Sequence, residues 1–178
     1  SNYQLVHQEG LVNLPGAVNR FVEIEGFISL KDTAATEPPE HLPENVEGVF
    51  REGATCLAVQ CYNASGTMFR LCIDLVTRGM LPEGDVDGLT SRIRRDLGLR
   101  LPWLFDHQIL PDGLRELSAC VREDGNDGAH AGTLTKNDAE DLLDFTKALL
   151  ERIYTEPERL RLAKERRDKR RTPPQPSA

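Results

Sequence analysis

The chain has 178 residues, a formal net charge of −7 at pH 7, and 39% hydrophobic residues. This length suffices for one domain with its own core and a small appendage. The longest apolar run is the four residues Cys56–Val59, whereas a membrane-spanning helix needs about 20. An acidic chain is not expected to coat nucleic acid without specificity. We expect a cytoplasmic protein with no membrane segment and no signal sequence.

Residues 1–36 are predicted to form a small β appendage. Val22 and Ile24 alternate with acidic residues, a pattern that favours a strand, and Tyr3–His7 could supply its partner in a hairpin. Three prolines follow within residues 37–43. Proline fits neither a helix interior nor a central strand, so we expect an extended linker there.

From residue 44 onward the apolar residues recur at spacings of three and four. This period predicts a mainly α fold, an antiparallel helical bundle over residues 44–156. The expected helices include a short one that Gly98 closes, one that Pro111 opens, and a long one that begins at Thr135. The Thr135 hydroxyl is placed to cap the backbone amide of Asp138.

Residues 157–178 are predicted to form a basic helical extension and a disordered tail. Between Glu158 and Arg171 there are eight Lys or Arg and three Asp or Glu, a local charge of +5. The remaining 14 basic and 26 acidic residues give −12. This extension could add phosphate affinity, or it could be a solvated helix end.

The four cysteines do not form the close pairs that zinc sites use. They are Cys56, Cys61, Cys72 and Cys120. We expect buried or half-buried thiols in a reducing compartment. No metal site and no cofactor are predicted.

Two groups of polar residues stand out at helical spacing. Arg122, Asn126 and His130 are four residues apart, so a helix would place them on one side, where they could hold a phosphate. An ordinary loop between helices would have a similar Asn- and Gly-rich sequence. Arg70 and Asp74 are also four apart, in an apolar segment. They could pair with each other, and a partly buried Arg70 would serve a helix contact or an anion.

These residues carry a family resemblance that extends over about residues 44–155. Met68–Asp74, followed about fifty residues later by Val121–His130, resembles a bacterial family catalogued as a domain of unknown function (4145). That family is similar to the HEPN superfamily of helical bundles, which includes metal-independent ribonucleases, toxins and defence proteins. Its members are often linked to restriction systems.

The resemblance implies a homodimer that acts on RNA without a metal. His130 would be the acid/base group, and Arg122 would stabilise phosphate charge, beside Asn126. We expect binding of RNA or nucleotide phosphate and a restriction or defence protein as partner. Gly125 stands where active members often have Arg. The alternative is a non-enzymatic dimerisation module in which Arg122, Asn126 and His130 have a structural role.

Overall fold

The computed structural model describes residues 2–5, 22–26, 35–121 and 134–171, and the chain divides into two units, Ser1–Ala35 and Thr36–Ala178. In the first unit, strands β1 (Asn2–Leu5) and β2 (Val22–Gly26) pair in antiparallel fashion. Leu5 lies opposite Val22, and the register shifts between Asn2 and Tyr3. The segment that would connect the two strands lies outside the described residues.

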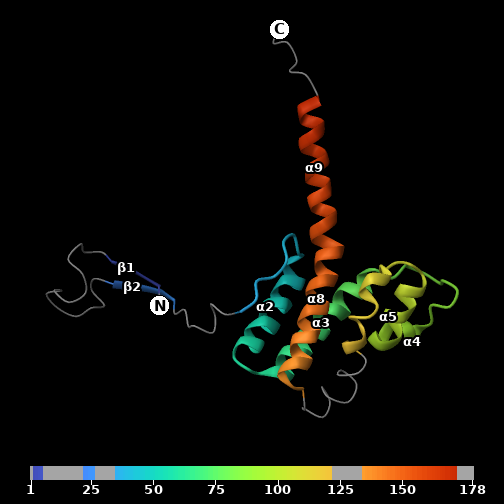
Figure 1. Ribbon diagram of the computed structural model, residues 1–178, viewed down its shortest axis with the longest axis horizontal. Coiled ribbons are helices and arrows are strands. Elements are labelled where there is room, and N and C mark those ends of the chain that lie inside the picture. The colour runs from blue at the N-terminus through green and yellow to red at the C-terminus, as the bar shows by residue number, and fades with distance from the viewer. Residues whose placement is uncertain (1, 6–21, 27–34, 122–133, 172–178) are drawn as a thin grey trace, which may run out of the picture. The chain divides into compact units, whose positions relative to one another are not determined.

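The second unit is mainly helical, as the sequence predicts (Figure 1). Helices α2 (Glu44–Ala58), α3 (Tyr62–Gly79) and α8 (Lys136–Leu150) pack around one core. The apolar stripes of these helices supply its largest buried side chains, among them Phe50, Phe69, Ile73, Leu142, Phe145 and Leu149. The rings of Phe50 and Phe69 lie 5.7 Å apart, so α2 and α3 meet through a tilted aromatic pair.

The predicted cap of α8 is confirmed. The Asp138 amide donates to the Thr135 hydroxyl at 3.4 Å, and the Thr135 amide donates to the Asp138 carboxylate at 2.6 Å. These two hydrogen bonds satisfy backbone donors that a helix start leaves free. The first turn of α8 therefore has a fixed position directly after Leu134.

The predicted helix end at Gly98 is wrong. Helix α4 (Ser91–Arg95) ends earlier, and α5 (Leu97–Asp106) contains both Gly98 and Pro102. The carboxylate of Asp96 accepts from the Leu99 amide at 3.3 Å and so starts the second helix. A proline inside a helix costs about 3 kcal/mol. Burial of apolar side chains at about 1.5–3 kcal/mol each outweighs this cost, and α5 buries Leu97, Leu101, Trp103, Leu104 and Phe105.

The predicted helix after Pro111 is also wrong at its start. Only the 3-10 turn η3 (Asp112–Leu114) forms there, and helical structure resumes at residue 119. Leu117 belongs to the apolar spacing that suggested the helix, yet it is 46% exposed. Ser118 and Val121 are buried, so the stripe is buried only toward its end, and burial is what usually stabilises a short helix.

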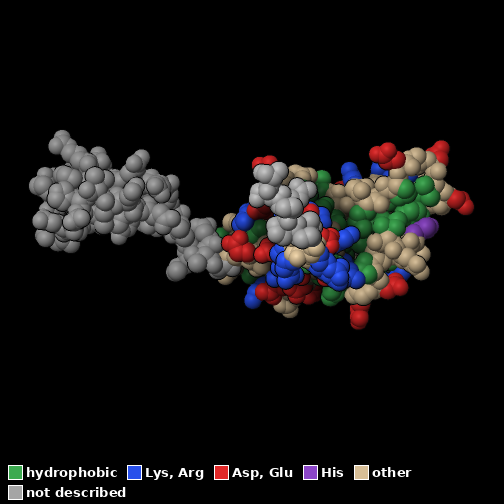
Figure 2. Space-filling view, turned by 90° about the horizontal axis from the view of Figure 1, so that it is seen from above, with side chains coloured by type: hydrophobic (Ala, Val, Ile, Leu, Met, Phe, Trp, Pro, Cys, Tyr) green, Lys and Arg blue, Asp and Glu red, His purple; other side chains and the backbone are tan. Residues whose placement is uncertain are grey.

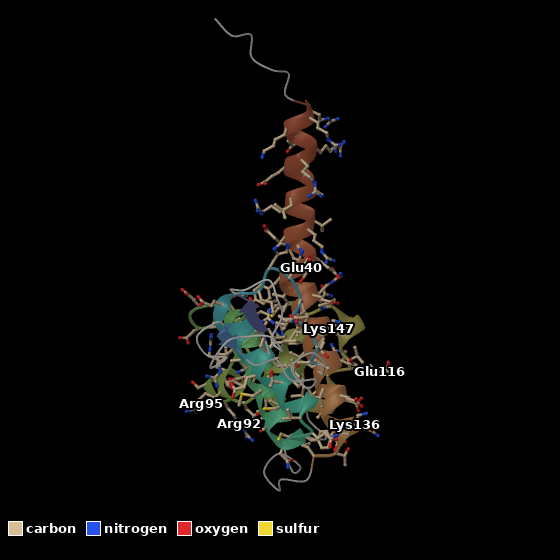
Figure 3. All side chains as sticks on the ribbon, turned by 90° about the vertical axis from the view of Figure 1, so that its left-hand side faces the viewer. Glu40, Arg92, Arg95, Glu116, Lys136 and Lys147 are labelled. Atoms are coloured by element: carbon tan, nitrogen blue, oxygen red, sulfur yellow. The ribbon has the colours of Figure 1, made fainter. Side chains whose placement is uncertain are left out.

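The backbone continues from α8 through the π-helical turn η4 (Glu151–Thr155) into α9 (Glu156–Arg171), so Pro157 does not stop it. Proline is tolerated in the first turn of a helix. No residue of α9 is buried, and the helix extends away from the other helices (Figure 1). Lys and Arg side chains gather around it in the view from above (Figure 2), and its side chains point outward on several sides (Figure 3).

Candidate functional site

Arg70 lies on α3, beside the buried face of that helix, and is half-buried. Its Nη1 donates a hydrogen bond to the backbone carbonyl of Val121, 51 residues further along the chain. Val121 directly precedes Arg122. The contact therefore links the helix that carries Arg70 and Asp74 to the start of the segment that carries Arg122, Asn126 and His130.

Asp74 binds two other arginines instead of Arg70. One carboxylate oxygen accepts from Nη2 of Arg100, and the other lies 2.9 Å from Nε of Arg78. The Arg70–Asp74 ion pair that the spacing allowed is not formed. Arg100 is fully buried and needs an opposite charge, since a buried ion without a partner is costly. Asp74 therefore has a structural partner in the core.

The other two nitrogens of Arg100 also have hydrogen-bond partners. Its Nε donates to the Thr77 hydroxyl at 3.1 Å, and its Nη1 donates to the Arg94 carbonyl at 2.6 Å. These bonds hold α5 against α3 and α4, and the guanidinium of Arg100 is fully buried. The sequence analysis missed this residue. The sequence does contain an indication of its role: Arg100 lies within the mostly apolar segment Leu97–Phe105, where a charged side chain needs a partner.

Arg70 differs from Arg100 because no carboxylate of the described residues lies within ion-pair distance of it. Burial lowers the pKa of Arg70, while Cys120, Asp74 and Asp96 act on that pKa in the opposite direction. An arginine remains protonated at any physiological pH. Arg70 is thus a half-buried cation that can still donate to an anion.

The predicted residues Arg122, Asn126 and His130 lie outside the described residues, and so do the rest of residues 122–133. The residues on both sides of this range contact α3. Val121 accepts from Arg70, and the Leu134 amide donates to the Asn63 side chain at 2.9 Å. Positions 63 and 70 are two helical turns apart, about 10 Å along the axis. The two described residues that flank this range therefore both contact α3.

Gly66 permits this approach to α3. A Cβ atom at this position would collide with the end of the Leu134 side chain and lie 3.2 Å from the end of Leu142. The lack of a side chain lets Leu134 pack directly onto the helix backbone between Asn63 and Arg70. The glycine thus sets where the chain re-enters the core.

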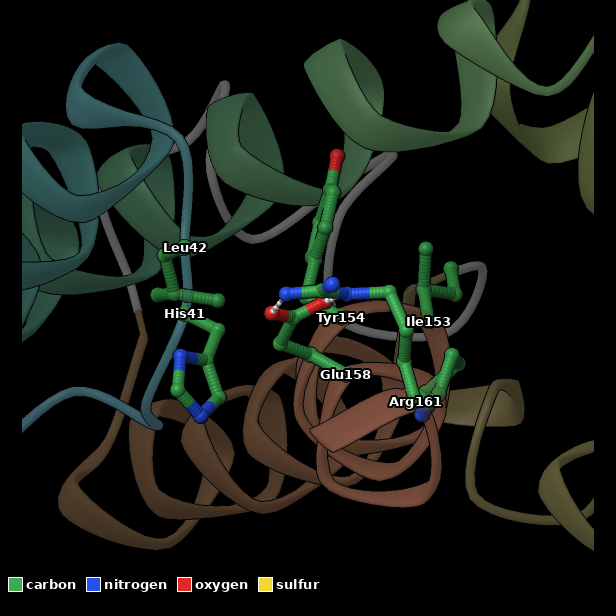
Figure 4. A pocket seen from close by; sticks show the side chains of 7 residues that line it. His41, Leu42, Ile153, Tyr154, Glu158 and Arg161 are labelled. Atoms are coloured by element: carbon green, nitrogen blue, oxygen red, sulfur yellow. Dashed lines mark hydrogen bonds and ion pairs between the residues drawn. The ribbon is translucent and has the colours of Figure 1, made fainter. Parts of the chain in front are cut away.

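A groove lies where the linker meets η4 and α9 (Figure 4). It has a volume of about 530 Å³ and is lined by His41, Leu42, Ile153, Tyr154, Pro157, Glu158 and Arg161. Its charged groups are matched: Glu158 binds Arg161 at 2.5 Å, and this hydrogen bond lowers the pKa of Glu158. Burial raises the pKa of Tyr154. The pairing of these charges therefore gives no indication that the groove binds a charged ligand.

Within the part of the chain that the structure describes, no three His, Cys, Asp or Glu residues gather as metal ligands would. Among the cysteines, Cys72 and Cys120 are buried and Cys56 is partly so, but Cys61 is exposed, contrary to the expectation of buried thiols. None of the described helices is long and apolar enough to cross a membrane.

A family model described as "Domain of unknown function (DUF4145)" matches residues 51–169, which include α3, α5, α8 and most of α9. No curated protein and no solved structure matches the chain.

Proposed function

The chain belongs to this family of domains of unknown function, and we propose that its helical unit binds a phosphate group of RNA or of a nucleotide beside Arg70. The observation that carries the proposal is the state of Arg70. It is a half-buried cation with one hydrogen bond to a backbone carbonyl and no carboxylate partner among the described residues. A guanidinium presents a planar fork of donors that fits phosphate oxygens.

The sequence places further phosphate-binding groups directly after the Arg70 contact. Arg122 follows Val121, and Asn126 and His130 come next at intervals of four. In the proposed site, Arg70 and Arg122 stabilise the phosphate charge and Asn126 donates from its amide. His130 exchanges a proton with a ribose hydroxyl or a leaving oxygen, since a histidine side chain ordinarily gains and loses a proton near neutral pH. This assignment makes the protein a candidate metal-independent endoribonuclease.

The wider proposal rests on the resemblance stated for Met68–Asp74 and Val121–His130. We propose a HEPN-like bundle that forms a homodimer and serves a bacterial restriction or defence system in the cytoplasm. In this proposal the N-terminal residues form a β-hairpin appendage. Light scattering of the purified chain tests the dimer, and a monomer at all concentrations would count against it.

A second candidate function is supported by the same contact. The bond from Arg70 to Val121 also positions two segments of the core, as Arg100 does for α5. If Arg122, Asn126 and His130 serve packing in the same way, the chain is a non-enzymatic module for dimerisation or protein interaction. Such a module would be a dimer that does not bind RNA.

The test compares Arg70→Gln with Arg78→Gln by fluorescence anisotropy of a labelled single-stranded RNA in EDTA. Both substitutions remove one charge from α3, but Arg78 is 56% exposed and already paired with Asp74. A charged hydrogen bond contributes about 1.5–3 kcal/mol. We expect Arg70→Gln to weaken binding about tenfold or more and Arg78→Gln to leave it nearly unchanged.

Two results would contradict the proposal: no RNA binding by the wild-type chain, or equal loss of affinity in the two variants. Cleavage is followed on the same RNA by gel electrophoresis, with His130→Ala as the comparison. Loss of cleavage with retained binding assigns His130 to catalysis. Binding without cleavage in either protein leaves a phosphate-binding module and removes the enzyme assignment.

A further inference from the structure

Helix α9 has two halves that differ in how their charges are matched. In the first half, each arginine has an acidic partner. Arg159 binds Glu40 at 3.0 Å, and Arg161 binds both Glu158 and Glu165. One turn earlier, Arg152 binds Glu156 at 2.5 Å. The base of the helix is thus close to neutral and is held by ion pairs.

The second half carries cations without such partners. Within two turns it has six: Lys164, Arg166, Arg167, Lys169, Arg170 and Arg171. None of these forms an ion pair with another described residue. Arg166 and Arg170 are four residues apart, as are Arg167 and Arg171. Like charges at this spacing repel each other in a helix, and an anionic partner would relieve this repulsion. The stretch also contains Glu165 and Asp168, so six positive and two negative charges leave it a formal charge of +4.

This basic half stands clear of the other described helices of the second unit. No residue of α9 is buried, and the helix leaves the other helices as an extended rod (Figure 1). Arg171 lies 13 residues beyond Glu158, about 20 Å along the helix axis. The Debye length at physiological salt is about 8 Å. The charges of the core are therefore largely screened from the last turns of α9.

The composition of α9 excludes most partners other than a polyanion. Membrane-surface helices need a broad apolar face, and coiled coils need apolar residues in heptads. The large aliphatic residues of α9 are Leu160 and Leu162 alone, and Leu160 is 72% exposed. Neither falls within Lys164–Arg171. A rod with cations on several sides, as Figures 2 and 3 show, fits a chain of phosphates.

We propose that Lys164–Arg171 binds the phosphate backbone of a nucleic acid, as a second contact for a polymer in addition to the proposed contact beside Arg70. The inference deepens the proposed function and rests on it for the class of ligand. It assigns to α9 the affinity that does not depend on base sequence and to Arg70 the contact with one phosphate. The ligand would then be a strand of RNA rather than a free nucleotide.

The test measures binding of the full chain to labelled single-stranded RNA at several salt concentrations. One variant carries Arg166→Gln, Arg167→Gln, Lys169→Gln and Arg170→Gln. The matched control carries Arg92→Gln, Arg95→Gln, Lys136→Gln and Lys147→Gln, on other helices (Figure 3). Both remove four positive charges, and glutamine is a good helix former. Circular dichroism confirms that each variant keeps its helix content.

We expect the α9 variant to lose RNA affinity and the control to retain it. Each phosphate contact contributes about 0.7 to the slope of log K against log salt for a single strand. The slope of the α9 variant should therefore fall by about 3. A DNA strand of the same sequence tests whether the sugar is recognised. Equal binding of DNA and RNA would assign the contact to the phosphates alone. Binding of RNA only would add a contact to the ribose.

The proposal is overturned if both variants lose affinity equally or if neither does. It is also overturned if α9 is needed for phosphatidylserine vesicles and not for RNA. The Arg70→Gln variant separates this inference from the proposed function. If Arg70→Gln loses RNA affinity and the α9 variant does not, the proposed site beside Arg70 stands and the proposed role of α9 is wrong. If the α9 variant loses affinity and Arg70→Gln does not, α9 binds RNA and the site beside Arg70 is wrong.

Discussion

Arg100 and Asp74 form an ion pair across 26 residues of sequence, with the guanidinium fully buried and the carboxylate 19% exposed. The pair joins α5 to α3. It also occupies the carboxylate of Asp74, which the sequence spacing had suggested as a partner for Arg70. Arg70 then keeps its charge without a carboxylate partner among the described residues. A structural contact in the core thus determines which arginine of this region can bind an anion.

The two members of this pair should respond differently to substitution. Asp74→Ala leaves the buried charge of Arg100 uncompensated, so we expect the free energy of unfolding to fall by about 3–5 kcal/mol. Arg100→Met leaves Asp74 partly exposed and bound to Arg78, so we expect a smaller loss of about 1–3 kcal/mol. Urea unfolding measures both. The double variant should be more stable than additivity predicts, and strict additivity would contradict the coupling.

The Cys72 thiol should make the free energy of unfolding depend on pH in the alkaline range. Burial raises its pKa to about 12 from an ordinary value of 9.0. In the unfolded chain the thiol loses its proton first, so the free energy of unfolding falls as the pH rises from 9 toward 12. Between pH 8 and pH 10 the loss from this group should be about 1.4 kcal/mol. Cys72→Ala should lack this part of the pH dependence.

Cys61→Ala is the control for this comparison, because Cys61 is exposed. Its unfolding free energy should follow the wild-type pH dependence. If the curve for Cys72→Ala runs parallel to that of the wild type, the folded and unfolded chains hold this proton equally and the assignment fails.

Among the helical glycines, Gly66 should tolerate replacement least, because Leu134 packs against α3 at this position. An alanine there meets the ends of Leu134 and Leu142, and overpacking of a core costs about 1–3 kcal/mol. Gly48→Ala in α2 meets no atom within 4 Å and should gain up to about 1 kcal/mol from helix propensity. Thermal unfolding of the two variants tests this contrast. Equal melting temperatures would mean that Leu134 is free to move aside.

The groove at the base of α9 should contain a carboxylate whose pKa depends on one arginine. The hydrogen bond from Arg161 lowers the pKa of Glu158. Arg161→Gln should therefore raise the pKa of Glu158 toward its ordinary value, as followed by carbon NMR during a pH titration. Arg152→Gln, which removes the partner of Glu156, should leave Glu158 unchanged. If the pKa of Glu158 rises by a similar amount in both variants, the loss of any nearby positive charge causes the change, and the hydrogen bond from Arg161 has no special role.

Local signals in the sequence predicted the main helices well. The apolar stripes of α2, α3 and α8 and the cap at Thr135 depend on residues close together in the chain, and the structure has them. The errors arose where distant contacts override local preference. Gly98 and Pro102 lie inside α5 because that helix buries much of its surface, and Leu117 fails to continue a helix because its side chain is left exposed.

The candidate site was only partly accessible from the sequence for the same reason. Spacing drew attention to Arg70 and Asp74, but it could not reveal that Arg100, 26 residues beyond Asp74, would bind the carboxylate. The contact of Arg70 with Val121 also depends on tertiary packing. The prediction for Arg122, Asn126 and His130 still rests on sequence, because these residues lie outside the described part of the chain.

The most direct measurement is an NMR titration of the arginine Nε–H signals with a short single-stranded RNA, with Arg70→Lys used to assign the Arg70 signal. Arg70 should shift in proportion to bound RNA, while Arg100, which is fully buried and bound to groups of the core, should not. If Arg70 keeps its position while RNA binds, or if no signal moves at all, the guanidinium beside Val121 does not hold a phosphate.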